Sequence, residues 1–165
     1  MKLGRRFYGG VSELRNRLSR ARYFRGHGVH SPFVYDLVRE VFMRRDLLPG
    51  GRALYDALLM AGVVQSRAIQ LQHLAIHCGY ATFGLNRADG DLCVVTRDTT
   101  RDELLAIVRQ AACDGRTVAV MSPCEGRERR ALCRRIAAEH GSTTVDNRAY
   151  LLIFNNHLPK QHFRI

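Results

Sequence analysis

Between residues 91 and 154, short apolar runs alternate with longer segments that carry one apolar face. The runs Leu92–Val95 and Thr117–Met121 are almost wholly apolar, which is typical of strands buried on both faces. A segment with helical periodicity follows each run. This order of strand, helix, strand and helix predicts a mostly parallel sheet with right-handed crossovers.

The two helices of this alternation have clear sequence boundaries. Thr100, with Glu103 three residues later, has the spacing of a capping box at the start of a helix expected over 100–112. The second helix is expected over 125–140, where Gly141 ends it. Both helices would pack one apolar face against the sheet.

The end of the chain predicts a hairpin and one further strand. The expected elements are strands at 142–145 and 150–154, a turn at 155–159 and a strand over 161–165. A hairpin introduces an antiparallel strand into an otherwise parallel sheet. We therefore expect an α/β fold with a small, mostly parallel sheet of about four strands, the last one antiparallel.

The preceding region is expected to be helical. Ser31, followed by proline, predicts the cap of a helix over 31–44, and a second helix is expected over 52–61. Residues 66–85 allow two interpretations: a helix, or a segment that includes a short strand at 74–77. We expect these helices to cover the surface that a larger sheet would otherwise bury.

Composition divides the chain into a basic segment, 1–30, and one domain, 31–165, with a helical part at 31–90 and a sheet part at 91–165. The basic segment has a net charge of +7, and the whole chain +11. It could form a short helix that packs on the domain. Alternatively, it could bind a polyanion such as nucleic acid, or an anionic surface.

No apolar run reaches the roughly 20 residues of a membrane helix, and no secretory signal follows the basic start, so a cytoplasmic location is expected. The five cysteines are scattered and form no C-x-x-C pair. We interpret them as free thiols and expect no metal site.

Two segments resemble a known family. Residues 25–38 contain H-G-V-H-S-P-F, which is similar to the opening of a family of bacterial proteins like the class I S-adenosylmethionine-dependent methyltransferases. Residues 151–154 and 158–163 resemble the terminal strands of that family, and the order of elements over 91–154 resembles the C-terminal half of its Rossmann-like sheet. The resemblance covers about two thirds of the chain, and shared topology alone would not specify a function.

The half of that fold that binds the cofactor is mostly missing. Methyltransferases of this class use a glycine-rich turn after the first strand and an acidic residue at the end of the second. The nearest segment here is 78–85, and Asp91 follows too closely for the roughly 30 residues of a further βαβ unit. We therefore expect a shortened, degenerate member of the family.

Three functions remain open. The first, which we expect, is a degenerate methyltransferase-like protein that acts as a non-catalytic binding or scaffold module; the other two are alternatives. The second is an active S-adenosylmethionine-dependent methyltransferase with an atypical cofactor site, which a homodimer could complete. The third is a basic protein associated with nucleic acid.

Candidate site residues follow from the resemblance and from strand ends. If S-adenosylmethionine binds, we expect it near Gly79 and Thr82 and near Thr96 and Asp98, which follow a strand at the ligand-binding edge of an α/β sheet. The candidates for phosphate or substrate binding, at a helix start, are His27, His30 and Ser31. Each of these also has a structural interpretation as a turn or cap residue, and no catalytic or metal-binding residue is assigned.

Overall fold

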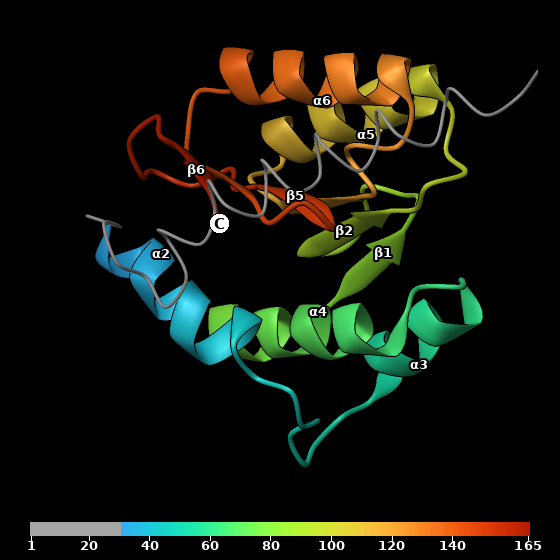
Figure 1. Ribbon diagram of the computed structural model, residues 1–165, viewed down its shortest axis with the longest axis vertical. Coiled ribbons are helices and arrows are strands. Elements are labelled where there is room, and N and C mark those ends of the chain that lie inside the picture. The colour runs from blue at the N-terminus through green and yellow to red at the C-terminus, as the bar shows by residue number, and fades with distance from the viewer. Residues whose placement is uncertain (1–30) are drawn as a thin grey trace, which may run out of the picture.

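The computed structural model describes residues 31–165. Within them, one sheet of six strands lies between two groups of helices, so the fold has three layers (Figure 1). The α/β class is thereby confirmed. The predictions for the basic segment, including the roles of His27 and His30, lie outside the described residues.

The sheet has the strand order β1-β2-β3-β5-β4-β6. Its strands are β1 Phe83–Leu85, β2 Leu92–Val95, β3 Thr117–Met121, β4 Thr144–Asp146, β5 Tyr150–Ile153 and β6 His162–Arg164. Only β5 runs antiparallel to its neighbours, β3 and β4. The sheet is mostly parallel as predicted, but it has more strands than expected. Its antiparallel strand lies inside the sheet and is followed in the chain by β6, which pairs parallel to β4.

Helices cover both faces of the sheet. They are α2 Pro32–Leu37, continued by the π-helical turn η2 Val38–Phe42, then α3 Ala53–Met60, α4 Gln65–Cys78, α5 Arg101–Cys113 and α6 Arg127–Glu139. The first group, through α4, packs on one face of the sheet, while α5 and α6 pack on the other (Figure 1). The amino-terminal helices therefore cover the sheet, as the sequence predicts.

The predicted caps form. The Ser31 hydroxyl accepts a hydrogen bond from the Val34 amide at 3.4 Å, so this residue starts α2. At α5, Thr100 accepts from the Glu103 amide, and the Glu103 carboxylate accepts from the Thr100 amide at 2.9 Å. Each cap satisfies backbone donors that a helix start leaves unpaired.

The ambiguous stretch 66–85 is a helix followed by a strand. Leu71 and Leu74 are fully buried on α4, and Gly79 ends this helix in the left-handed conformation at φ 68°. The alternative strand at 74–77 is therefore wrong. The strand of this region is β1, which begins after the helix cap.

Buried polar side chains fix α4 to the segments before it. The Gln70 amide donates to the Phe42 carbonyl at 2.9 Å, and a His73 ring nitrogen lies 2.7 Å from the Asp46 carbonyl. The Gln72 side chain accepts from the Tyr55 amide at 3.1 Å. These bonds satisfy backbone groups that no helix or strand pairs, which lets polar residues occupy a buried face.

The connection between β1 and β2 is only residues 86–91, although parallel neighbours normally need a dozen or more. The chain turns back directly against β1. A β-carbon on Gly84 would stand 2.8 Å from the Arg87 carbonyl oxygen, and one on Gly90 would stand 2.5 Å from the Phe83 Cα. Two glycines therefore make this short crossover sterically possible.

Candidate anion-binding site

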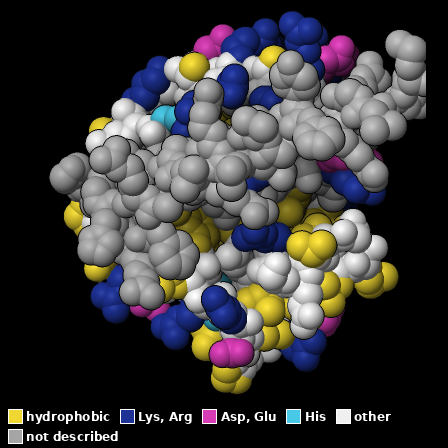
Figure 2. Space-filling view, in the orientation of Figure 1, with side chains coloured by type: hydrophobic (Ala, Val, Ile, Leu, Met, Phe, Trp, Pro, Cys, Tyr) yellow, Lys and Arg dark blue, Asp and Glu magenta, His cyan; other side chains and the backbone are white. Residues whose placement is uncertain are grey.

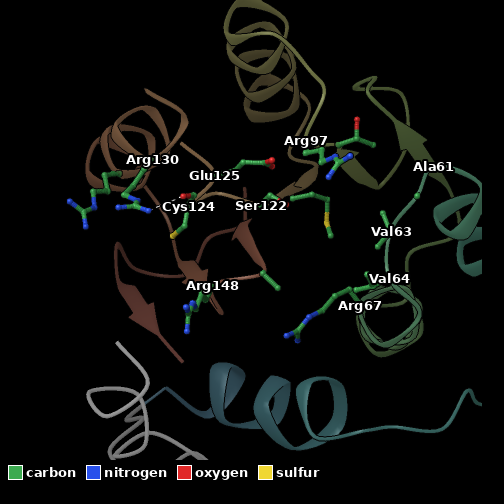
Figure 3. A pocket seen from close by; sticks show the side chains of 15 residues that line it. Ala61, Val63, Val64, Arg67, Arg97, Ser122, Cys124, Glu125, Arg130 and Arg148 are labelled. Atoms are coloured by element: carbon green, nitrogen blue, oxygen red, sulfur yellow. Dashed lines mark hydrogen bonds between the residues drawn. The ribbon is translucent and has the colours of Figure 1, made fainter. Parts of the chain in front are cut away.

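A cleft with a volume of about 570 Å³ lies at the carboxyl ends of β2 and β3 (Figure 3). The residues after these strands form one wall, and the α3–α4 turn, 61–64, forms another. The start of α6 and the turn before β5 complete it. Open α/β sheets bind ligands at this edge, where loops can carry functional side chains without disturbing the strands.

Arginines dominate the charge of the cleft. Glu125 is the one acidic residue among the described residues that line it. Five basic side chains line it: Arg67, Arg97, Arg130, Arg134 and Arg148. Figure 3 shows Arg130 and Arg148 on one side of the hollow and Arg67 and Arg97 on the other. A concave surface with this excess of guanidinium groups attracts anions.

Two of these arginines are held by neutral acceptors. Arg130 donates to the Cys124 carbonyl at 3.0 Å, and Arg67 donates to the Gln70 side chain at 2.8 Å. Neither hydrogen bond neutralises the charge of its arginine, because both acceptors are uncharged. Both guanidinium groups thus keep donors for an anionic ligand.

A tight turn after β3 shapes the floor of the cleft. Ser122 has a positive φ of 49°, uncommon for a residue other than glycine. Its amide donates to the Ala149 carbonyl at 2.8 Å, and its carbonyl accepts from the Glu125 amide at 3.1 Å. This backbone conformation turns the chain from the sheet into α6 beside the cleft.

Arg129 joins the two strand ends that border the cleft. Its Nη2 donates to the Thr96 carbonyl at 2.9 Å and to the Met121 carbonyl at 3.0 Å. Its Nη1 lies 3.4 Å from the Thr99 carbonyl. We therefore assign this guanidinium a structural role, since it binds backbone oxygens at the carboxyl ends of β2 and β3.

Asn86, at the end of β1, organises the neighbouring loop. Its Nδ2 donates to the Thr96 hydroxyl at 3.0 Å. Its Oδ1 accepts from the Thr96 amide at 2.8 Å and from the Thr99 hydroxyl at 2.9 Å. These polar groups therefore satisfy one another at the carboxyl edge of β1 and β2.

Among the residues predicted near a cofactor, Thr96 lines the cleft. Asp98 is exposed on the same loop and forms a surface ion pair with Arg97, with nitrogen and oxygen 3.5 Å apart, but it is not a lining residue. Ser31 caps α2 and is not a lining residue either.

Gly79 and Thr82 lie at the other edge of the sheet. They precede β1, so the segment interpreted as a turn after the first strand comes before it. The Thr82 amide donates to the Asp91 carboxylate at 2.8 Å, and the Ala81 amide donates to it at 2.9 Å. These residues tie together the amino ends of β1 and β2, and they do not meet Thr96 in one site.

The cleft has few groups for acid–base or nucleophilic chemistry. Ser122 and Cys124 line it, but no histidine does among the described lining residues. Two cysteines outside the lining, Cys93 and Cys133, are buried in the core. Burial raises the pKa of the Cys93 thiol and raises that of Cys133 to about 11, so both stay protonated at neutral pH. Within residues 31–165, no cluster of three or more histidine, cysteine or acidic side chains could hold a metal ion.

Comparison with known proteins assigns no family. The chain matches no protein-family model, no curated protein sequence and no solved structure. No helix in the described part of the chain is long and apolar enough to cross a membrane. What the cleft binds is therefore inferred from its own residues.

Proposed function

We propose that this chain is a non-catalytic, methyltransferase-like binding protein that holds an anionic ligand in the arginine cleft. The observation that carries the proposal is the charge of the cleft: five arginines from four separate segments face one glutamate. Guanidinium groups bind phosphate and carboxylate oxygens through paired hydrogen bonds, so a phosphate-bearing ligand suits this arrangement.

The residues present do not fit S-adenosylmethionine well. The family resemblance implies a second strand beside the first, ending in an acid for the ribose, but among residues 31–165 no strand pairs with the outer side of β1. The crossover at 86–91 leaves no room for that unit. Asn86 and Thr96, at the corresponding edge, satisfy each other's polar groups. These features support binding without methyl transfer.

The lining residues also argue against nucleophilic catalysis. A serine or cysteine nucleophile needs an adjacent base within hydrogen-bond reach. The only acidic or histidine side chain among the described residues of the lining is Glu125, which is exposed. The arrangement is better suited to holding a charged ligand than to activating one.

A calorimetric titration of the full chain tests the proposal. At low ionic strength, inorganic pyrophosphate should bind with micromolar affinity, and added salt should weaken the binding because it screens charges. S-adenosylhomocysteine should give no heat of binding. Micromolar binding of S-adenosylhomocysteine without any binding of pyrophosphate would reverse the proposal in favour of a methyltransferase cofactor site.

Two other partners follow from separate observations: nucleic acid from the net charge of +11, and a second copy of the chain from the edge of the sheet. Nucleic acid would be bound through the same phosphate chemistry, with a steep dependence on salt. A homodimer could cover the edge of the sheet at β1. Light scattering during the same titrations would detect a dimer by its mass.

A further inference from the structure

An exposed apolar turn, residues 59–64, borders the arginine cleft; we call it the apolar lip. Its sequence is Leu-Met-Ala-Gly-Val-Val. Met60 is 91% exposed and Val64 is 65% exposed. The lip adjoins the arginine cleft directly, because 61–64 are lining residues of it. Hydrophobic side chains gather at the lower right of Figure 2, over α3 and the turn after it, beside basic side chains.

The lip has a defined conformation. At the end of α3, the Val63 amide donates to the Leu58 carbonyl at 2.9 Å and the Gly62 amide donates to the Leu59 carbonyl at 3.0 Å. With Gly62 at φ 76°, this is a Schellman-type helix end. The same geometry buries Leu58 in the core and directs Met60 to solvent. The exposed side chains are thus presented on a fixed turn.

An apolar turn beside an anion-attracting cleft limits the classes of ligand that would contact both features. Exposed apolar side chains grouped beside polar residues mark an interaction surface. A free phosphate or a nucleic acid would use the arginines and leave the lip in water. A phospholipid membrane offers both partners: anionic phosphates at its surface and hydrocarbon just beneath.

We propose that the apolar lip inserts into the surface of an anionic membrane while the arginine cleft binds the phosphate of a lipid headgroup. This proposal rests on the proposed anion-binding function and names the source of the anion. Met60 and Val64 would leave water for the acyl region, and the arginines of the cleft would face the phosphates. The protein would bind at the membrane surface without crossing it.

The chain contains no tryptophan, so one introduced residue can report on a single position. We would place the reporter in the full chain as Met60→Trp, with Ile76→Trp as the matched control. Ile76 is 46% exposed near the other end of α4. With vesicles of phosphatidylcholine and phosphatidylglycerol, the emission of the reporter at 60 should shift to the blue, and that of the reporter at 76 should not. Neither should shift with phosphatidylcholine alone.

The variant Met60→Ser tests how much insertion contributes to membrane binding, because Met60 belongs to the apolar lip but is not a lining residue of the cleft. Losing the insertion of this apolar side chain should weaken sedimentation with anionic vesicles about tenfold. Its affinity for pyrophosphate should equal that of the natural chain. Sedimentation of the natural chain with anionic vesicles is not by itself evidence that the apolar lip inserts, because the basic segment 1–30 would also attract these vesicles.

The inference is overturned if the reporter at 60 does not shift, or if both reporters shift equally. It is also overturned if the serine variant binds vesicles as tightly as the natural chain, or if duplex DNA is bound while vesicles are not. In each of these cases, binding of pyrophosphate would leave the proposed function standing. Absence of pyrophosphate binding by the natural chain would remove the proposed function itself.

Discussion

The backbone of Gly90 lies against that of Phe83, so closely that a β-carbon on the glycine would stand 2.5 Å from the phenylalanine Cα. Gly90→Ala should therefore destabilise the protein by about 1–3 kcal/mol, because the crossover must move away from β1. Urea unfolding would measure the change. Gly141→Ala is the control, since no atom lies within 4 Å of that β-carbon position. Equal stability of the two variants would contradict the close packing of the crossover.

Arg129 should matter for stability more than its neighbours on α6. Replacing it with alanine leaves the Thr96 and Met121 carbonyls without its charged donor, which should cost about 1–3 kcal/mol. Lysine should restore only part of the loss, because one ammonium group cannot match the fork of a guanidinium. Arg127→Ala, on the exposed start of the same helix, should be nearly neutral in thermal unfolding. If the Arg129→Ala protein is as stable as that control, the hydrogen bonds of Arg129 to these two carbonyls do not stabilise the fold.

Asp91 should make stability depend on pH in the acid range. Hydrogen bonds from the Thr82 amide and hydroxyl, and from the Ala81 amide, lower the pKa of its carboxyl. A folded-state pKa below the unfolded value of about 3.9 means that the contribution is complete above that value and is lost as the pH falls through the folded pKa.

The comparison with Asp91→Asn isolates this contribution. At pH 7 the variant should have the lower melting temperature. The difference in melting temperature between the natural chain and the variant should become smaller below about pH 4, because the natural carboxyl becomes protonated. A difference that stays constant from pH 7 to pH 3 would show that the charge of Asp91 does not stabilise the fold.

Much of the fold could be predicted because its signals are local. The Ser31 cap, the capping box of Thr100 and Glu103, and the apolar strands β2 and β3 each depend on residues close together in sequence. The predicted helix over 100–112 accordingly agrees with α5 to within one residue at each end. Such elements need no knowledge of the partner against which they pack.

The strand β1 could not be recognised in this way. Its central residue is Gly84, which in a sequence indicates a break. The glycine is required because the loop at 86–91 returns across the strand, and its role depends on Gly90 six residues later. That requirement is tertiary, and neither strand propensity nor periodicity expresses it.

Of the candidate site, the sequence identified the loop after β2, where Thr96 reaches the cleft. It did not bring the arginines together in one site, because Arg67 and Arg148 are distant in sequence and line the same cleft only in the folded chain. Arg97 was one sequence signal of a basic site, because it lies two residues after the end of the buried strand β2. Weighing the charge of every strand end would have directed attention to this edge.

The most direct test of the account is a calorimetric titration of pyrophosphate into Arg130→Ala/Arg134→Ala. Both side chains line the cleft, whereas Arg109, the control position, lies on α5 away from it. Losing two charged donors should weaken binding by at least about tenfold, and Arg109→Ala should leave the affinity unchanged. If the double variant and the control bind pyrophosphate equally well, the arginine cleft is not the anion site and the central claim fails.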